Sequence, residues 1–324
     1  MIAHYIQQTK VRLKSMADSL VRETWLTSWE LIRITIPVTI ATKILEELGL
    51  INTLSVILEP VMSLIGLPGP LGLVWATAML TNMYGGIAVF AALAPGLDLT
   101  GAQVTVLCSA MLIAHSLPIE LSVSKRAGAA VMPIALIRLI GAVVYAYILN
   151  TICLVFSLWQ DPAVLLFKAT AEAGDLLQWA LDQLQNLGMI VFIIFCIVVC
   201  MRLLRVFGVL DLLEKVLAPV LPVFGMGRQA APITVVGMIM GIGYGGALII
   251  RETSTGKLNK DEVFNSMALM GLCHGLVEDT LIMAAIGGKF GGILWGRIVF
   301  SLIVTYLLVR MLRSLADRRI RRQA

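Results

Sequence analysis

The stretch ELGLINTLSVILEPVMSLIG at residues 47–66 decides the fold, because a second copy, VFGVLDLLEKVLAPVLPVFG, follows at residues 206–225. The copies lie 159 positions apart and share two glycines and a proline at matching places. At the same offset His115 aligns with His274. The chain has only 3 histidines, so this pairing indicates an internal duplication rather than chance.

Composition predicts that the duplicated unit lies in a lipid bilayer. Of 324 residues, 59% are hydrophobic and 14% are charged, whereas a soluble domain keeps about a quarter of its residues charged. The apolar segments are runs of Leu, Ile, Val and Ala without the alternation of a β-barrel, so we expect an all-α polytopic membrane protein. The net charge of +5 comes from Lys and Arg at loops and ends, which argues against nucleic acid as a partner.

Each half is predicted to contain the same five elements, namely a span, an amphipathic helix interrupted by proline, an apolar stretch broken by glycine, and two more spans. In the first half these lie at 28–46, 50–65, 70–94, 103–123 and 131–155. In the second half they lie at 187–206, 209–224, 230–250, 263–284 and 292–312.

The distribution of positive charge favours opposite orientations for the two halves. Residues 44–124 contain no Lys or Arg, whereas the matching window 203–283 contains six. Cytoplasmic loops are enriched in these residues. If each glycine-broken stretch is a re-entrant hairpin, every half crosses the membrane three times and the second half is inverted. Both termini then lie in the cytoplasm, and we expect a multi-pass protein of a bacterial-type cytoplasmic membrane.

This topology divides the chain into five parts. They are an amphipathic cytoplasmic segment at 1–27, a first repeat at 28–156, an extracytoplasmic linker helix at 157–185, a second repeat at 186–312, and a basic cytoplasmic tail at 313–324.

Polar residues interrupt one apolar span at equivalent places in the two halves. They are His115, Ser116 and Glu120 in the first, and His274, Glu278 and Asp279 in the second. Ionisable groups are costly in hydrocarbon and usually face a cavity or a partner. Glu120 and Asp279 follow their histidines by five residues, about 140° around an ideal helix, so only a break in the helix would bring each pair together. Pro118 and Gly275 predict such breaks.

Two readings of these residues stay open at this stage. They form a substrate site at the membrane midplane, or each histidine donates to a carboxylate or a backbone carbonyl and merely ties helices together. Arg138, about one turn inside its span, is expected to extend to the cytoplasmic face.

The tips of the predicted hairpins form a second group of candidates. Asn82, Tyr84 and Tyr244 are candidate substrate contacts, and the glycines are expected to let the backbone turn and act as a gate. These glycines are Gly85, Gly86, Gly243, Gly245 and Gly246.

The motifs EPVMSLIGLPGPLG, NMYGGIAVF, APVLPVFGMGRQAAP and GYGGALIIRE resemble the nucleoside recognition, or Gate domain, family. That family is related to the cores of concentrative nucleoside transporters and of bacterial ferrous-iron transporters. The resemblance extends over about residues 28–312. It implies transport of a nucleoside-like or other small polar solute, coupled to Na⁺ or H⁺ and with no other cofactor.

Three functions are therefore compared. The first is a transporter or gated permease, not an enzyme, that we expect to form a homo-oligomer in the bilayer. The second is divalent-metal transport, because two imidazoles and carboxylates suit such ions. Its ligands would be His115, His274, Glu120, Glu278 and Asp279. The third is a scaffold or signalling subunit that transports nothing.

Overall fold

The computed structural model describes residues 25, 29, 32–33, 36–37, 40–41, 43–45, 47–166 and 176–323. Within these residues the chain is helical apart from turns, short connections and one isolated bridge between Thr100 and Pro162. The prediction of an all-α fold is therefore confirmed over the described residues. The predicted segment 1–27 and most of the span at 28–46 lie outside the described residues.

The helices follow the predicted order in both halves. The first half contains α2 (Leu50–Leu64), α3 (Leu71–Leu80), α4 (Met83–Leu93), η1 (Ala94–Gly96), α5 (Gly101–Ile113), α6 (Leu117–Arg126) and α7 (Val131–Val155). The second contains α8 (Leu176–Val206), α9 (Val209–Leu217), η2 (Leu221–Phe224), α10 (Ala230–Met240), α11 (Ile242–Ser254), α12 (Lys260–Leu272), α13 (Glu278–Ala285), η3 (Gly291–Gly296) and α14 (Arg297–Gln323).

The starts of α5 and α12 show how closely the halves correspond. Each helix has 13 residues and begins with a capping box, formed by Thr100 with Gln103 and by Asn259 with Glu262. In this motif two side chains satisfy backbone N–H groups that a helix start leaves unpaired. The shared glycines have a local reason too, since Gly66 and Gly225 have φ angles of 75° and 72°, a conformation that side chains disfavour.

The predicted interruptions of the amphipathic helices and of the glycine-broken stretches are only partly present. Helix α2 continues through Pro60, so the predicted interruption is wrong there, whereas α9 ends at Leu217 and Pro222 lies in η2. The predicted breaks at 70–94 and 230–250 are present. They fall at Thr81–Asn82 and at Gly241.

Four stretches are long and apolar enough to cross a membrane among the residues searched, namely Gly101–Arg126, Val131–Val155, Ala180–Val206 and Gly291–Ser314. Their surroundings differ. In the most apolar window of Gly101–Arg126, 78% of the residues are buried, against 17% for Ala180–Val206. Burial of apolar residues on all sides marks α5 as a central helix. The exposed apolar surface of α8 suits contact with lipid.

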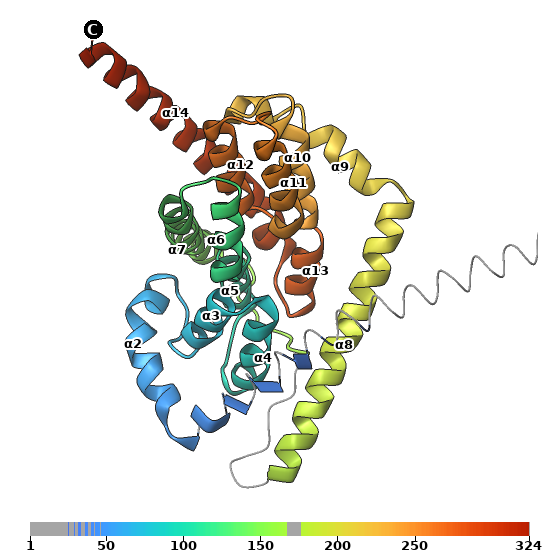
Figure 1. The fold of residues 1–324 in the computed structure, drawn as a ribbon. Helices are drawn as coiled ribbons and strands as arrows, with labels where there is room; N and C mark the ends of the chain where they lie inside the picture. Colours follow the sequence, from blue (N-terminus) through green and yellow to red (C-terminus); the bar gives the residue numbers. More distant parts are fainter. Residues whose placement is uncertain are drawn as a thin grey trace, which may run out of the picture.

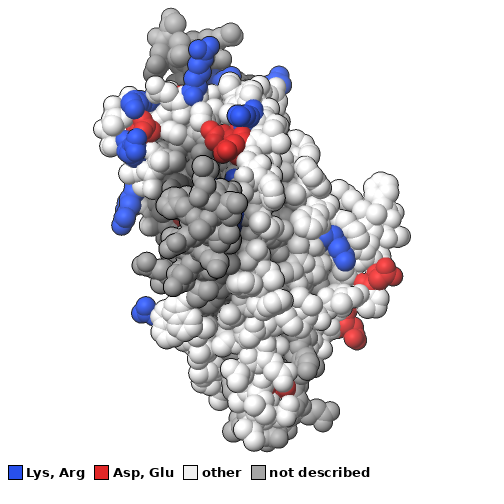
Figure 2. Space-filling view, turned by 90° about the vertical axis from the view of Figure 1, so that its right-hand side faces the viewer, with Lys and Arg blue, Asp and Glu red and all other residues white. Residues whose placement is uncertain are grey.

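Helix α8 runs along one side of the molecule and leads from the end that holds α2, α3 and α4 to the end that holds α9 (Figure 1). It also crosses the predicted boundary between linker and second repeat, since the helix is continuous from Leu176 to Val206. The linker helix and the following span are therefore one element over the described residues. Figure 2 shows a broad uncharged surface on this side, with several Lys and Arg side chains gathered toward its upper end.

Candidate functional site

The two candidate histidines lie in the short breaks that separate α5 from α6 and α12 from α13. Helix α5 ends at Ile113 and α6 begins at Leu117, while α12 ends at Leu272 and α13 begins at Glu278. Left-handed residues turn the chain in both breaks, namely Ser116 with φ 48° and Gly275 with φ 57°. The predicted breaks are thus present in both spans.

Each break is hydrogen-bonded to the helix that precedes the neighbouring hairpin break. The Ser116 N–H donates to the Ala78 carbonyl in α3, and the Leu276 N–H donates to the Met238 carbonyl in α10, both at 2.9 Å. Backbone groups released by a broken helix need such partners in an apolar environment. These bonds hold each irregular segment in a defined place.

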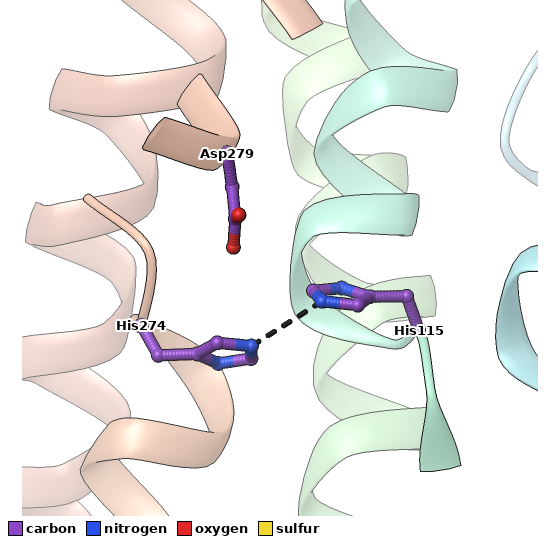
Figure 3. Close-up of side chains that lie close together, drawn as sticks. All are labelled: His115, His274 and Asp279. Carbon is purple, nitrogen blue, oxygen red and sulfur yellow. Dashed lines mark hydrogen bonds between the residues drawn. The ribbon is translucent and has the colours of Figure 1, made fainter. Parts of the chain in front are cut away.

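The breaks meet in the interior of the molecule, where His115 and His274 face each other (Figure 3). Their Nε2 atoms are 3.3 Å apart, and their ring centroids are 5.0 Å apart. Each Nδ1 lies 2.8 Å from the backbone carbonyl four residues earlier, at Met111 and Met270 respectively. Both histidines are buried.

Glu120 joins this pair from the first turn of α6. Its Oε1 lies 3.4 Å from Nε2 of His115 and 3.2 Å from Nε2 of His274. Its other oxygen, Oε2, forms a buried ion pair with Arg138. One carboxylate from the first half therefore contacts the histidines of both halves.

Arg138 contributes to the cluster, which contradicts the expectation that it reaches the cytoplasmic face. Its side chain is fully buried. Besides the ion pair, Nε donates to the Ile113 carbonyl at 2.9 Å and Nη2 donates to the His115 carbonyl at 3.0 Å. An arginine near the end of a span can extend to water, but the acceptors freed by the break in its neighbour hold this one inside.

Asp279, the residue equivalent to Glu120, points toward the two imidazoles from the first turn of α13 (Figure 3). One ligand atom each from His115, His274 and Asp279 lie within 4.8 Å of one another. A Cβ atom at Gly275 would overlap the Asp279 carboxylate, so glycine at this break makes room for the acid. These residues, with Glu120, are the ones that could hold a metal ion.

Arg297 occupies the position equivalent to Arg138, yet its contacts differ. Nη2 donates to Thr280 Oγ1 at 3.1 Å, while Nε and Nη1 are buried without a hydrogen-bond partner among the described residues. Arg297 directly follows the π-helical turn η3, where the matching residues of α7 form regular α-helix. Tyr145 Oη donates to the Gly292 carbonyl inside that turn. The two halves thus hold their equivalent arginines differently.

The described contacts of the hairpin candidates lie mainly within their own hairpins. Asn82 caps α4 by accepting from the Gly85 N–H, and Gly86 allows close packing against Ala78 and Met111. The other predicted gate residues, Gly243, Tyr244, Gly245 and Gly246, lie inside α11. The backbone breaks themselves, at Asn82 and Gly241, fall two to five residues before these glycines. Ser116 lies within the first histidine break, and Glu278 is the first residue after the second.

Two described cavities lie beside α8 and away from the histidines. One has a volume of about 240 Å³ and is lined mainly by apolar side chains of α4 and α8, together with Gln183 and Asn186. A smaller one, about 10 Å³, includes Tyr84 in its lining. Neither cavity is lined by the histidines or by Glu120.

The sequence analysis assigned Arg138 to the cytoplasmic face and did not consider Arg297, although a signal was present that joins both to the histidines. Arg138 and Arg297 align at the same offset of 159 residues as the two histidines. An ionisable pair shared by both copies of an apolar unit belongs with the other shared ionisable residues.

Comparison with known proteins agrees with the resemblance inferred from the motifs. Residues 28–142 match the family model Gate, described as nucleoside recognition. The chain is also 26% identical over 285 residues to the uncharacterized membrane protein YvoD of Bacillus subtilis (strain 168). The aligned region covers 86% of this chain and 89% of the relative. No solved structure matches the chain.

Proposed function

We propose that this Gate-domain membrane protein, whose nucleoside recognition match covers residues 28–142, is a permease for a small polar solute. The solute passes the buried junction where the breaks of two inverted halves meet. The proposal assigns the chain no catalytic step.

The observation that carries the proposal is the contact between His115 and His274, 3.3 Å apart in two broken spans. Irregular backbone at membrane depth persists only where it is buried in protein or lines a path for polar solutes. A purely structural tie needs no ionisable groups, and two imidazoles with carboxylates are expensive to keep in an apolar interior. Inverted halves with broken helices at their junction are the architecture of secondary transporters.

Inversion of the halves is supported by charge and by the arrangement of elements. The window 203–283 carries six basic residues and the matching window 44–124 carries none. Helices α2 and α9 are equivalent in sequence but lie toward opposite ends of the molecule (Figure 1). In this arrangement α3–α4 and α10–α11 are re-entrant hairpins. The breaks at Thr81–Asn82 and at Gly241 act as gates on the two sides of the junction.

Transport is tested with purified protein in liposomes. Uptake of radiolabelled nucleosides, organic acids and divalent cations is compared between the wild-type protein and the double variant His115→Ala with His274→Ala. The permease predicts uptake of at least one class and its loss in the double variant. If no class accumulates in wild-type liposomes under Na⁺ or H⁺ gradients, the scaffold function is supported instead. Cross-linking in the membrane reports whether the protein is a homo-oligomer.

Topology is tested separately with single cysteines at Lys43 and Arg202, which precede the equivalent glycines Gly49 and Gly208. Cys196 and Cys200 are at least partly accessible and are first replaced by serine. An impermeant maleimide added to intact cells should label position 43 and spare position 202. Labelling of both from the same side would refute inversion.

A further inference from the structure

We propose that His115, His274 and Glu120 bind one divalent first-row transition-metal ion, with Asp279 as the fourth ligand, and that this ion is the solute of the permease. Binding of the ion stands on the cluster alone. Its transport rests on the proposed function.

The hydrogen bonds of the two imidazoles fix where their lone pairs point. A carbonyl oxygen can only accept, so the Nδ1 atoms that face the Met111 and Met270 carbonyls at 2.8 Å must carry hydrogen. In a neutral imidazole the other nitrogen then has a free lone pair. Backbone carbonyls hold metal-binding histidines in this tautomer in many metalloproteins.

Three acceptor atoms therefore meet at one point. They are Nε2 of His115, Nε2 of His274 and Oε1 of Glu120. No N–H or O–H group lies between neutral imidazoles and a carboxylate, so their lone pairs repel one another unless a cation binds among them. Because His115 and Glu120 belong to the first half and His274 to the second, the cation would lie at the junction between the halves.

The spacing of these atoms matches a tetrahedral site. Zinc binds imidazole nitrogen and carboxylate oxygen at about 2.0–2.2 Å in tetrahedral geometry, which places neighbouring ligand atoms about 3.3–3.6 Å apart. The three separations in the cluster are 3.3, 3.4 and 3.2 Å. An ion of this size fits between the three atoms with little movement of the side chains.

Arg138 prepares Glu120 for this role. The guanidinium binds Oε2, which leaves Oε1 directed at the histidines. Its further bonds to the carbonyls of Ile113 and His115 fix its own position. Partners of this kind orient the ligands of metal sites and strengthen binding.

Asp279 completes the set. It lies in the same group of potential ligands as the two histidines, within 4.8 Å, and it is only partly buried, so its carboxylate has room to move onto the ion. Imidazole with carboxylate suits zinc, iron and related ions, whereas magnesium and calcium prefer oxygen alone. A nucleoside would need a pocket of about 300–1,000 Å³, and the imidazole rings are in contact at the junction.

The test is metal binding by the full chain in detergent, without a polyhistidine tag. After treatment with a chelator, the protein is titrated with Zn²⁺, Mn²⁺ and Co²⁺, and bound metal is counted by mass spectrometry. We expect one ion per chain and the visible absorption of tetrahedral Co²⁺. His115→Gln and His274→Gln should each weaken binding at least about 100-fold, since each removes one ligand.

Two variants keep the result interpretable if a histidine variant fails to fold. Asp279→Asn alters a partly exposed ligand and should weaken binding about 10-fold or more. Ser109→Ala removes a hydroxyl buried in α5 without a described hydrogen-bond partner and should bind like the wild-type protein. Replacement of His4, the third histidine, controls for metal bound elsewhere.

Each outcome separates the two proposals. Folded wild-type protein that binds no ion, or that binds equally after loss of either histidine, overturns the metal site. A nucleoside that raises the melting temperature when no metal does so overturns the site and leaves the permease standing. Stoichiometric metal binding without uptake of any solute class into liposomes retains the site and refutes the permease. Metal binding with uptake of another class alone retains both and refutes only the ion as the solute.

Discussion

Arg138 and Arg297 should respond to the same substitution with opposite changes in stability. Both are fully buried and occupy equivalent positions. Arg138 has an ion pair with Glu120 and two carbonyl acceptors. Among the described residues, Arg297 donates one hydrogen bond, to Thr280 Oγ1, and its Nε and Nη1 are buried without a hydrogen-bond partner. Methionine fills much of the same volume and donates no hydrogen bond.

The magnitudes follow from these contacts. Arg138→Met leaves the carboxylate of Glu120 buried without its cation, which costs about 3–5 kcal/mol. Arg297→Met gives up one hydrogen bond, worth about 1 kcal/mol, and removes two unsatisfied donors that cost about 1–3 kcal/mol each. We therefore expect the Arg297→Met variant to be more stable than the wild-type protein by about 1–5 kcal/mol. The two variants should differ by about 4 kcal/mol or more.

The assay is reversible unfolding of both variants in mixed micelles, without added metal and at one detergent ratio. Tryptophan fluorescence reports the transition. Thr280→Val serves as a control, because it removes only the hydroxyl that accepts from Arg297 and should destabilise the protein. Equal destabilisation by the two arginine variants would refute the reasoning, since it would mean that Arg297 is as well paired as Arg138.

Three further substitutions test the elements around the cluster. Tyr145→Phe removes the donor to the Gly292 carbonyl in η3 and should lower the free energy of unfolding by about 1–3 kcal/mol, measured as above. Gly275→Ala places a side chain at φ 57° against the Asp279 carboxylate. We expect the free energy of unfolding to fall by at least about 1–2 kcal/mol and metal binding to weaken. Unchanged metal binding would contradict the role of Asp279. Asn259→Ala breaks the capping box of α12 and should cost about 1 kcal/mol, with metal affinity retained once the protein is folded.

The sequence by itself determined the features that depend on local chemistry. Hydrophobic composition determined that the chain is helical and bound to membrane, because a bilayer leaves few ways to satisfy backbone polar groups. Pro118 and Gly275 predicted that the spans break beside His115 and His274, since proline and glycine impose or permit non-helical backbone. The offset of 159 residues related the two sets of helices before any contact was known.

The tertiary structure decided which of these residues meet. Of the predicted midplane residues, His115, His274, Glu120 and Asp279 lie close together. In the second group of candidates, Asn82 caps α4 and Gly86 packs closely against Ala78 and Met111. Arg138 points inward because carbonyls freed by a distant break accept its hydrogen bonds. Helix α8 joins two segments that the charge pattern had separated. The pattern of residues along the chain indicates local structure, such as helices and their breaks. Which lone pairs and charges of the two halves come into contact depends on how the helices pack, and a short stretch of sequence does not contain that information.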